Sequence, residues 1–336
     1  MKSLVVERPG VLTLAERPLA EPGPGEVRIR VERAGICGSD VHIFHGRNPF
    51  ARYPRVIGHE FFGRVDKAGE GAGLPVGTRV VVDPVISCGH CYPCSIGRPN
   101  VCTSLQVIGV HRDGGFSEFA CVPAGNAYPV PDTVSDDQAA LVEPFAVAAN
   151  MTDHTGVRAA DIALVYGAGP IGLMVVQVLK WVYGVSRLVV TDRIDARLEA
   201  ARANGADQAI NTANQPLAPI LAAAGLSPTL VIDTACHPSI LAEAIEIASP
   251  AARIGIMGFD AEPSLVSQQK VTSKELSIHS SRLNGRKFPK VIDWFASGRL
   301  QPERLITHRF AIADFAAAFD AFENRPAECC KVQFSF

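Results

Sequence analysis

Residues 162–172 read Ile-Ala-Leu-Val-Tyr-Gly-Ala-Gly-Pro-Ile-Gly, an apolar run followed by a glycine-rich turn. The apolar run predicts a buried strand, and the uncharged residues that follow the turn predict a helix. The glycines have the spacing G-x-G-x-x-G. Gly167 allows a tight turn, Gly169 lets the backbone approach a pyrophosphate, and Gly172 permits close packing of the helix on the strand. This stretch predicts a dinucleotide-binding fold.

The residues around this turn indicate which dinucleotide is bound. Pro170 and Ile171 begin the helix, whose free N–H groups face a bound phosphate. Asp192 lies at the end of the next predicted strand, where a carboxylate accepts hydrogen bonds from the adenosine ribose and repels a 2′-phosphate. Arg193 and Arg197 can accommodate that phosphate, so NADP is the alternative to the NAD that we expect. A helix cap with solvated arginines would leave the glycines unexplained.

Two other features of the sequence compete with this interpretation. The uncharged stretch 162–179 reaches the lower limit for a membrane span, but the glycine turn interrupts it. A second glycine-rich run, residues 69–73, opens no helical pattern and predicts only a turn.

Strands and helices alternate after about residue 161. Strands are predicted at 187–191, 208–210, 230–233 and 253–257, and helices at 194–204 and 239–248. Such alternation predicts an α/β domain over residues 149–285, with a doubly wound parallel sheet of the Rossmann type.

The remainder of the chain differs in composition and in its pattern of apolar residues. Residues 1–148 are rich in Gly, Pro and Val, with short alternating runs such as 26–31, and predict a mainly β domain. Residues 286–336 contain two helical patterns and a final apolar strand. We expect this segment to return and complete the first domain.

Four cysteines lie close together in the run CGHCYPCSIGRPNVC, at positions Cys88, Cys91, Cys94 and Cys102. This spacing can surround one ion tetrahedrally, and four thiolates are typical of a closed structural zinc site. Disulfides and chance are the alternatives. The odd total of nine cysteines and the absence of a signal-peptide pattern at the N-terminus favour a reducing cytoplasm.

Composition excludes some classes of partner. Charged residues make up 20% of the 336 residues, and the formal net charge is −2. No field of one sign would attract nucleic acid or a membrane surface. A small-molecule substrate is therefore expected.

A second set of metal-ligand residue types lies outside the cysteine run, at Cys37, His59, Glu60 and Glu143. Sulfur, imidazole and carboxylate suit Zn²⁺, and three protein ligands leave a fourth place for water or an alcohol. None of these residues is diagnostic alone. Glu143 stands in an apolar run, where an unpaired carboxylate would be costly, so it needs a partner.

Several motifs resemble a known family. GICGSDVHIFHG, GHEFFGRV, the four-cysteine run, LVEPFAVAAN and VYGAGPIG occur here in the order found in zinc-containing medium-chain alcohol and polyol dehydrogenases. Glu60 after the histidine and Glu143 before a proline are similar to the polyol and threonine dehydrogenase branch. NPFARYPRVIGHEFFG, ACHPSIL and SSRLN resemble bacterial starvation-sensing dehydrogenase-like proteins and, less closely, L-galactonate and L-gulonate 5-dehydrogenases.

The resemblance implies a fold and a set of roles. Residues 1–148 would form a GroES-like catalytic domain with a structural zinc lobe at about 84–104. Each chain would hold two zinc ions, the catalytic one on Cys37, His59, Glu60 and Glu143. The hydroxyl of Ser39 would take the alcohol proton and His42 would pass it to water. A homodimer or homotetramer would be expected.

Substrate choice rests on weaker signals. Arg282 resembles an arginine that reaches substrate in the polyol branch, and a guanidinium binds both oxygens of a carboxylate. Asn48, His111 and Asn284 are candidates for hydroxyl contacts, with loop stabilisation as the alternative for each. We expect oxidation of a secondary alcohol of a sugar acid such as L-gulonate or L-galactonate. A polyol dehydrogenase, an L-threonine dehydrogenase and a non-catalytic NAD-binding sensor are the alternatives.

Overall fold

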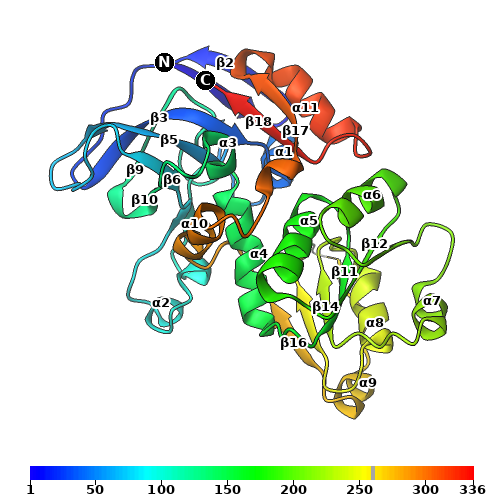
Figure 1. The fold of residues 1–336 in the computed structure, drawn as a ribbon. Helices are drawn as coiled ribbons and strands as arrows, with labels where there is room; N and C mark the ends of the chain where they lie inside the picture. Colours follow the sequence, from blue (N-terminus) through cyan, green and yellow to red (C-terminus); the bar gives the residue numbers. More distant parts are fainter. Residues whose placement is uncertain (259–261) are drawn as a thin grey trace. The chain divides into compact units, whose positions relative to one another are not determined.

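The chain forms two units in the computed structural model, which describes residues 1–258 and 262–336 (Figure 1). The first unit comprises Met1–Ala146, Asn284–Gly298 and Pro302–Phe336. The second unit comprises Val147–Leu283 and Arg299–Gln301. Both labelled ends of the chain therefore lie in the first unit.

The first unit is built mainly of β-strands. Its strands are β1 (Lys2–Arg8), β2 (Val11–Glu16), β3 (Glu26–Gly35), β4 (Arg55–Val56), β5 (Glu60–Ala68), β6 (Arg79–Val82), β7 (Val85–Ile86), β8 (Gln106–Val107), β9 (Phe119–Pro123), β10 (Ala127–Pro129), β17 (Ile306–Ala311) and β18 (Lys331–Ser335). Its helices are α1 (Gly38–Phe44), α2 (Tyr92–Ser95), α3 (Asp136–Ala139), α10 (Phe288–Ala296) and α11 (Phe315–Asn324). Helix α4 (Val142–Thr155) begins in this unit and continues into the second.

The main sheet of the first unit pairs strands from the first part of the chain with the two C-terminal strands. Its order is β10-β6-β5-β3-β18-β17, and β9 also pairs with β3. In the registers, Gly35 of β3 lies opposite Glu60 of β5 and also opposite Gln333 of β18. Strand β18 thus completes the sheet that β3 began, and it does so beside the start of α1.

The second unit is a doubly wound parallel sheet with helices on both faces (Figure 1). Its strands are β11 (Ile162–Tyr166), β12 (Arg187–Asp192), β13 (Gln208–Asn211), β14 (Leu230–Asp233), β15 (Arg253–Ile256) and β16 (Ser277–Ser280). Its further helices are α5 (Pro170–Gln177), α6 (Asp195–Ala203), α7 (Leu217–Ala223), α8 (Pro238–Ile247) and α9 (Gln268–Ser273), and a π-helical turn, Val178–Tyr183, extends α5.

The strand order β13-β12-β11-β14-β15-β16 reverses direction at β11, as in the Rossmann fold. This confirms the predicted fold class, an α/β Rossmann sheet together with a mainly β domain. The short elements α7, α9 and β16 were not predicted. Strand β16 is polar and mostly exposed, so it lacks the apolar signal of a central strand.

Residues 299–301 depart from the expected domain division. We expected residues 286–336 to belong wholly to the first unit, yet Arg299–Gln301 group with the second. The side chain of Gln177 explains this, because its amide donates to the carbonyl of Gln301 and its oxygen accepts the N–H of the same residue. Such a long-range pairing has no signature in the local sequence.

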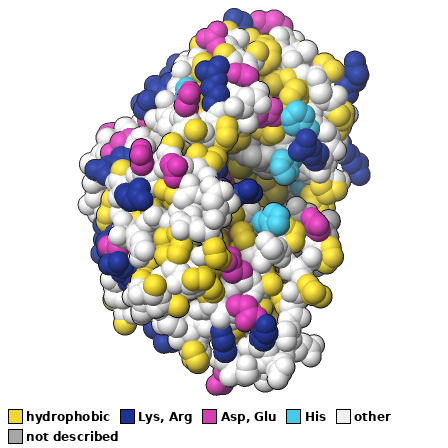
Figure 2. Space-filling model, turned by 90° about the vertical axis from the view of Figure 1, so that its right-hand side faces the viewer, with side chains coloured by type: hydrophobic (Ala, Val, Ile, Leu, Met, Phe, Trp, Pro, Cys, Tyr) yellow, Lys and Arg dark blue, Asp and Glu magenta, His cyan; other side chains and the backbone are white. Residues whose placement is uncertain are grey.

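Surface charge is mixed in sign. Figure 2 shows basic and acidic side chains interspersed with apolar ones over the face that it presents. Among the described residues, no helix has the length and apolar character needed to cross a membrane.

Candidate active site and cofactor site

The four cysteine sulfurs of residues 88–102 lie close together in the first unit. The Sγ atoms of Cys91 and Cys94 are 3.5 Å apart, those of Cys91 and Cys102 are 3.7 Å apart, and those of Cys88 and Cys102 are 3.5 Å apart. Four sulfurs at about 2.3 Å from a zinc ion would be separated by about 3.8 Å. All four thiols are free of disulfides. Their spacing therefore fits a tetrahedral zinc site.

Backbone N–H groups donate to several of these sulfurs and favour their negative charge, although burial and the neighbouring thiols raise the pKa of Cys94 to about 11. The N–H of Cys88 donates to Cys102 Sγ over 3.3 Å, and that of Ser104 donates to the same sulfur over 3.4 Å. The N–H groups of Thr103 and Cys94 lower the pKa of the Cys91 thiol to about 5. Thiolates are the form that binds metal, so the donor set agrees with the geometry.

Three of the four other candidate ligands come together in the first unit. One ligand atom from each of Cys37, His59 and Glu60 lies within 4.8 Å of the other two. The pairing of β3 with β5 places Gly35 opposite Glu60, and Cys37 follows two residues after that pair. His59 and Glu60 are buried and Cys37 is partly buried. A thiol, an imidazole and a carboxylate so close together fit a zinc ion with an open coordination position.

Asp40, which was not predicted from the sequence, lies beside this cluster. Its side chain has no exposed surface, and it accepts the N–H of Cys37 over 3.0 Å and that of Gly58 over 3.1 Å. Its Oδ1 lies 3.4 Å from His59 Nδ1. A carboxylate on that nitrogen favours a proton there, which leaves Nε2 to bind a metal. A buried acid three residues after a candidate ligand was the signal available in the sequence.

The charges around His59 favour a cation at this place. Burial works against a charged imidazole, but the negative charges of Asp40 and Cys37 outweigh it and raise the pKa of His59. In the absence of a metal, a proton would supply the positive charge that these groups attract. A metal ion would displace that proton, because only the neutral imidazole is a ligand.

Glu60 has a second partner that the sequence did not reveal. The Nζ of Lys331, at the start of β18, pairs with Glu60 Oε2 and donates to the carbonyl of Ile36 over 2.8 Å. The two side chains are 2% and 1% exposed. Burial lowers the pKa of Lys331. The negative charges of Glu60 and Cys37 raise it by more, so the pKa is raised overall. Lys331 therefore remains charged and holds one oxygen of Glu60.

Glu143 lies outside the three-residue set, although it shares its surroundings. It is in the first turn of α4, 3% exposed. Burial raises the pKa of Glu143 to about 7, with the charge of His59 opposing this rise and that of Glu60 adding to it. The charges of both residues therefore act on Glu143, although its carboxylate is not one of the three grouped ligand atoms. Its role as a fourth ligand stays a prediction.

The two predicted relay residues lie on α1. The hydroxyl of Ser39 is 3.4 Å from His59 Nε2, so it borders the ligand cluster. His42 follows three residues later, on the same side of the helix, and is exposed. A path from the cluster to solvent along this face is consistent with the expected proton relay.

The candidate substrate contacts lie in separate places. Asn48 accepts the N–H of Phe50 over 2.9 Å, and His111 Nδ1 accepts the N–H of Val107 over 3.0 Å, so both stabilise loops. Asn284 has no exposed surface and donates to Asp83 Oδ1 over 2.9 Å. This burial leaves Asn284 no surface for a substrate, and we no longer propose it as a contact. Arg282 is partly buried and belongs to the second unit.

The glycine turn of the second unit borders a cavity of about 740 Å³. Gly167 has a φ of 89°, which favours glycine, and a Cβ at Gly172 would collide with the carbonyl oxygen of Gly167. The N–H of Ala168 donates to Asp192 Oδ2 over 2.8 Å, so the acid is fixed beside the turn. Pro170 starts α5, as predicted.

The cavity also contains the predicted arginines. Arg193 and Arg197 both line it, together with Asp192. Arg193 is exposed and Arg197 partly buried. The turn, the acid and the arginines thus lie around one space that a dinucleotide can enter.

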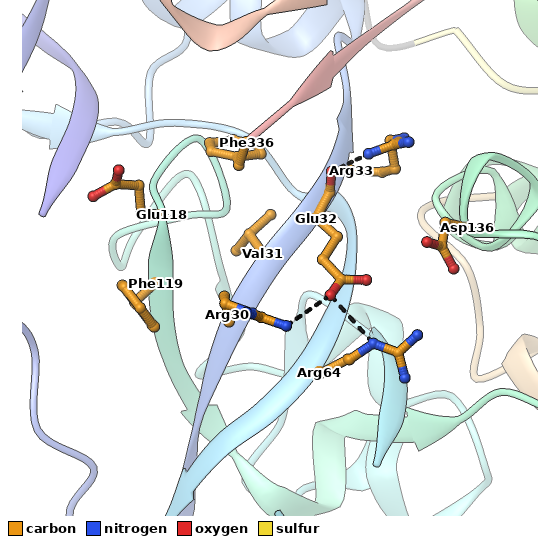
Figure 3. A pocket seen from close by; sticks show the side chains of 9 residues that line it. All are labelled: Arg30, Val31, Glu32, Arg33, Arg64, Glu118, Phe119, Asp136 and Phe336. Atoms are coloured by element: carbon orange, nitrogen blue, oxygen red, sulfur yellow. Dashed lines mark hydrogen bonds and ion pairs between the residues drawn. The ribbon is translucent and has the colours of Figure 1, made fainter. Parts of the chain in front are cut away.

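A second cavity, of about 590 Å³, has different chemistry (Figure 3). Glu32 on β3 pairs there with Arg30 and with Arg64, and the acidic and basic residues that line the cavity are equal in number. No candidate site residue lines it. It gives no indication of a ligand.

Comparison with known proteins agrees with this geometry. The model of the alcohol dehydrogenase GroES-like domain matches residues 23–132, and the zinc-binding dehydrogenase model matches residues 170–297. The chain belongs to the zinc-binding alcohol dehydrogenase family. It is an oxidoreductase that acts on a CH–OH group with NAD and zinc, as the sequence predicted.

Individual relatives cover nearly the whole chain. The starvation-sensing protein RspB of Escherichia coli K12 is 59% identical over 100% of this chain and 99% of its own length. The structure of the short chain alcohol dehydrogenase RspB of E. coli CFT073 with NADH has a TM-score of 0.98, with 58% identity over 100% of this chain and 99% of that one. An L-galactonate-5-dehydrogenase of E. coli K12 is 32% identical over 97% of this chain and 96% of its own length. An L-threonine 3-dehydrogenase of E. coli K12 / DH10B is 34% identical over 93% of each.

Proposed function

We propose that the chain oxidises a secondary alcohol of a sugar acid, of the L-gulonate or L-galactonate kind, with NAD⁺ as the hydride acceptor. The observation that carries the chemistry is the cluster of Cys37, His59 and Glu60, whose ligand atoms lie within 4.8 Å of one another. Three protein ligands of this kind leave room for an alcohol.

The residues around the cluster have separate tasks. A zinc ion bound there supplies a Lewis acid that makes an alcohol oxygen more acidic. Asp40 holds His59 in the tautomer that binds metal through Nε2. Ser39, which borders the cluster, accepts the alcohol proton while its own hydroxyl proton passes to the ribose hydroxyl of the nicotinamide nucleotide, and exposed His42 takes up that proton and releases one to water. The carbinol carbon can then transfer hydride to the nicotinamide.

The acid class of substrate is supported by one residue and one likeness. Arg282 is partly buried, and a planar guanidinium binds a carboxylate through two parallel hydrogen bonds. The likeness is to the L-galactonate-5-dehydrogenase described above. L-threonine also has a carboxylate and a secondary alcohol, and a threonine dehydrogenase matches at a similar level. The substrate assay must therefore separate these two.

The test is an assay of NADH formation with the zinc-loaded protein. L-gulonate, L-galactonate, L-idonate, sorbitol and L-threonine are each supplied with NAD⁺. Formation of NADH with the aldonates in preference to sorbitol and threonine supports the proposal. Formation with only neutral polyols, or only threonine, contradicts it.

A variant of the proposed carboxylate partner sharpens this assay. Arg282→Gln is expected to raise the KM for the aldonate at least tenfold, because a buried charge-assisted pair is lost, with a smaller effect on kcat. Arg286→Gln is a matched control, since Arg286 is exposed and lies four residues away. An unchanged KM in Arg282→Gln would remove this residue from the proposal.

A further inference from the structure

The cavity of the second unit has room for more than phosphate and ribose. The glycine turn borders one part of it, and Asp192, the expected ribose partner, borders the next. Beyond these lie Leu217 of α7 and Ile240 of α8, whose apolar side chains suit the faces of a planar base. Since phosphate, ribose and adenine are joined in series in NAD, a bound adenine base would lie against these two apolar side chains.

A buried hydroxyl group lies at this part of the cavity. Tyr166, the last residue of β11, lines the cavity and is 4% exposed. Its ring packs in the core between the sheet and helices α7 and α8, with Leu164 and Ala244 among its neighbours. Within the described part of the chain, the Tyr166 hydroxyl has no hydrogen-bond partner. A buried hydroxyl without a partner is costly, so it indicates a contact that forms in another state.

Glu243 provides that contact. It is on α8, lines the same cavity and is partly buried. Burial first, and then the charge of the Glu243 carboxylate and a hydrogen bond to it that falls outside good geometry, raise the pKa of Tyr166. The carboxylate and the hydroxyl line the same cavity, and a change of side-chain rotamer would let the carboxylate accept the Tyr166 proton with one oxygen while the other faces the cavity.

We propose that Glu243, positioned by the Tyr166 hydroxyl, accepts a hydrogen bond from the 6-amino group of the adenine base and so selects adenine. Hypoxanthine has a 6-oxo group in the same position, which is an acceptor and would face the carboxylate without a proton between them. Asp192 does not perform this task, because the N–H of Ala168 fixes it beside the glycine turn, where the ribose is expected. The selection therefore depends on Glu243.

The test compares NAD⁺ with nicotinamide hypoxanthine dinucleotide, in which a 6-oxo group replaces the 6-amino group and N1 of the base carries a proton. Both are titrated calorimetrically into the zinc-loaded full chain, without an alcohol. The native chain is expected to bind NAD⁺ about tenfold more tightly, as for the loss of one charge-assisted hydrogen bond. Equal affinity would overturn the proposal. Because no alcohol is present, the result does not depend on the substrate proposed above.

Variants assign the selectivity to the two residues. In Glu243→Gln the amide can either accept from adenine or donate to hypoxanthine, so the tenfold ratio should fall close to one. In Tyr166→Phe the ratio should fall severalfold, because the carboxylate is no longer positioned. Glu246→Gln is the matched control, since Glu246 is on the same helix, exposed and paired with Lys270. It should keep the native ratio.

The outcomes separate selection from general damage. A structural defect would weaken the binding of both dinucleotides equally and leave their ratio unchanged. A native ratio in Glu243→Gln overturns the proposal, and a native ratio in Tyr166→Phe overturns the positioning role of the tyrosine. If Glu243→Gln does not fold, Glu243→Met provides a second removal of the carboxylate, with the same expected loss of the ratio.

Discussion

The pair of Glu60 and Lys331 shows how one residue can serve stability and chemistry together. Both side chains are buried, and Lys331 also donates to the carbonyl of Ile36, next to Cys37. Lys331 occupies Oε2 of Glu60, so the other oxygen is the one available to a metal. A tethered carboxylate of this kind can bind or release an ion without losing all its hydrogen bonds.

Removal of Lys331 should destabilise the first unit. In Lys331→Met the Glu60 carboxylate is left buried and unpaired, and we expect the free energy of unfolding to fall by about 3 kcal/mol. Urea unfolding of the protein after zinc has been removed with a chelator, followed by fluorescence, measures this loss, because no metal then compensates the charge of Glu60. The double variant Glu60→Gln/Lys331→Met is the control and should lose less than the sum of the two single variants. Additive losses would show that the two side chains do not interact.

Some residue roles could be predicted from the sequence, and others could not. The glycines act within a few residues of one another, so their spacing alone predicts the turn around Gly167. Asp40 was missed because an acid near a helix start has many ordinary uses. Lys331 lies 271 residues from Glu60, and only the pairing of β18 with β3 brings them near each other. Asn284 was proposed as a contact although its burial was not visible in the sequence.

At the scale of elements, the segment from Cys88 to Cys102 lacks a core of its own. It contains only the four-residue helix α2 and a single 3₁₀ turn, Pro99–Val101. Tyr92 and Ile96 are 75% and 50% exposed, so apolar burial contributes little here. Backbone N–H groups directed at sulfur provide much of the local order. The segment should therefore depend on its metal.

Replacement of one lobe cysteine tests this dependence. Cys94→Ser is expected to reduce the zinc content from two ions per chain to one and to expose residues 88–102 to limited proteolysis, because three ligands hold the ion weakly. Atomic absorption and peptide mapping measure both effects. Cys121→Ser is the control, since Cys121 lies on β9, outside both clusters. Two ions per chain in Cys94→Ser would contradict the assignment.

Helices and strands were predicted best where a single pattern of apolar residues determined them. Buried parallel strands such as β11 and β14 are short apolar runs, so the sequence located them within a residue or two. Helix α9 and strand β16 were missed because their residues are largely polar and their position is set by neighbours rather than by an apolar pattern.

For the whole molecule, binding of the dinucleotide should increase the free energy of unfolding. NAD⁺ at one hundred times its dissociation constant is expected to raise the free energy of unfolding by about 2.7 kcal/mol, because only the folded chain binds it. Thermal unfolding with and without NAD⁺ measures this as an increase in Tm. NADP⁺ at the same concentration should raise Tm less, since Asp192 repels its 2′-phosphate. An equal or larger increase with NADP⁺ would indicate that Arg193 and Arg197 determine cofactor choice.

The order of the strands along the chain determines which unit can fold first during synthesis. Residues 331–335 leave the ribosome about 300 residues after β3, and the whole second unit is made between them. The second unit can therefore fold while the first unit still lacks β18, the strand that carries Lys331. Until β18 is in place, the Glu60 carboxylate lacks its lysine partner. Cys37 and His59, which lie beside Glu60, are then held by a sheet from which one strand is missing. Loading of the catalytic ion should be among the last events in the maturation of a nascent chain.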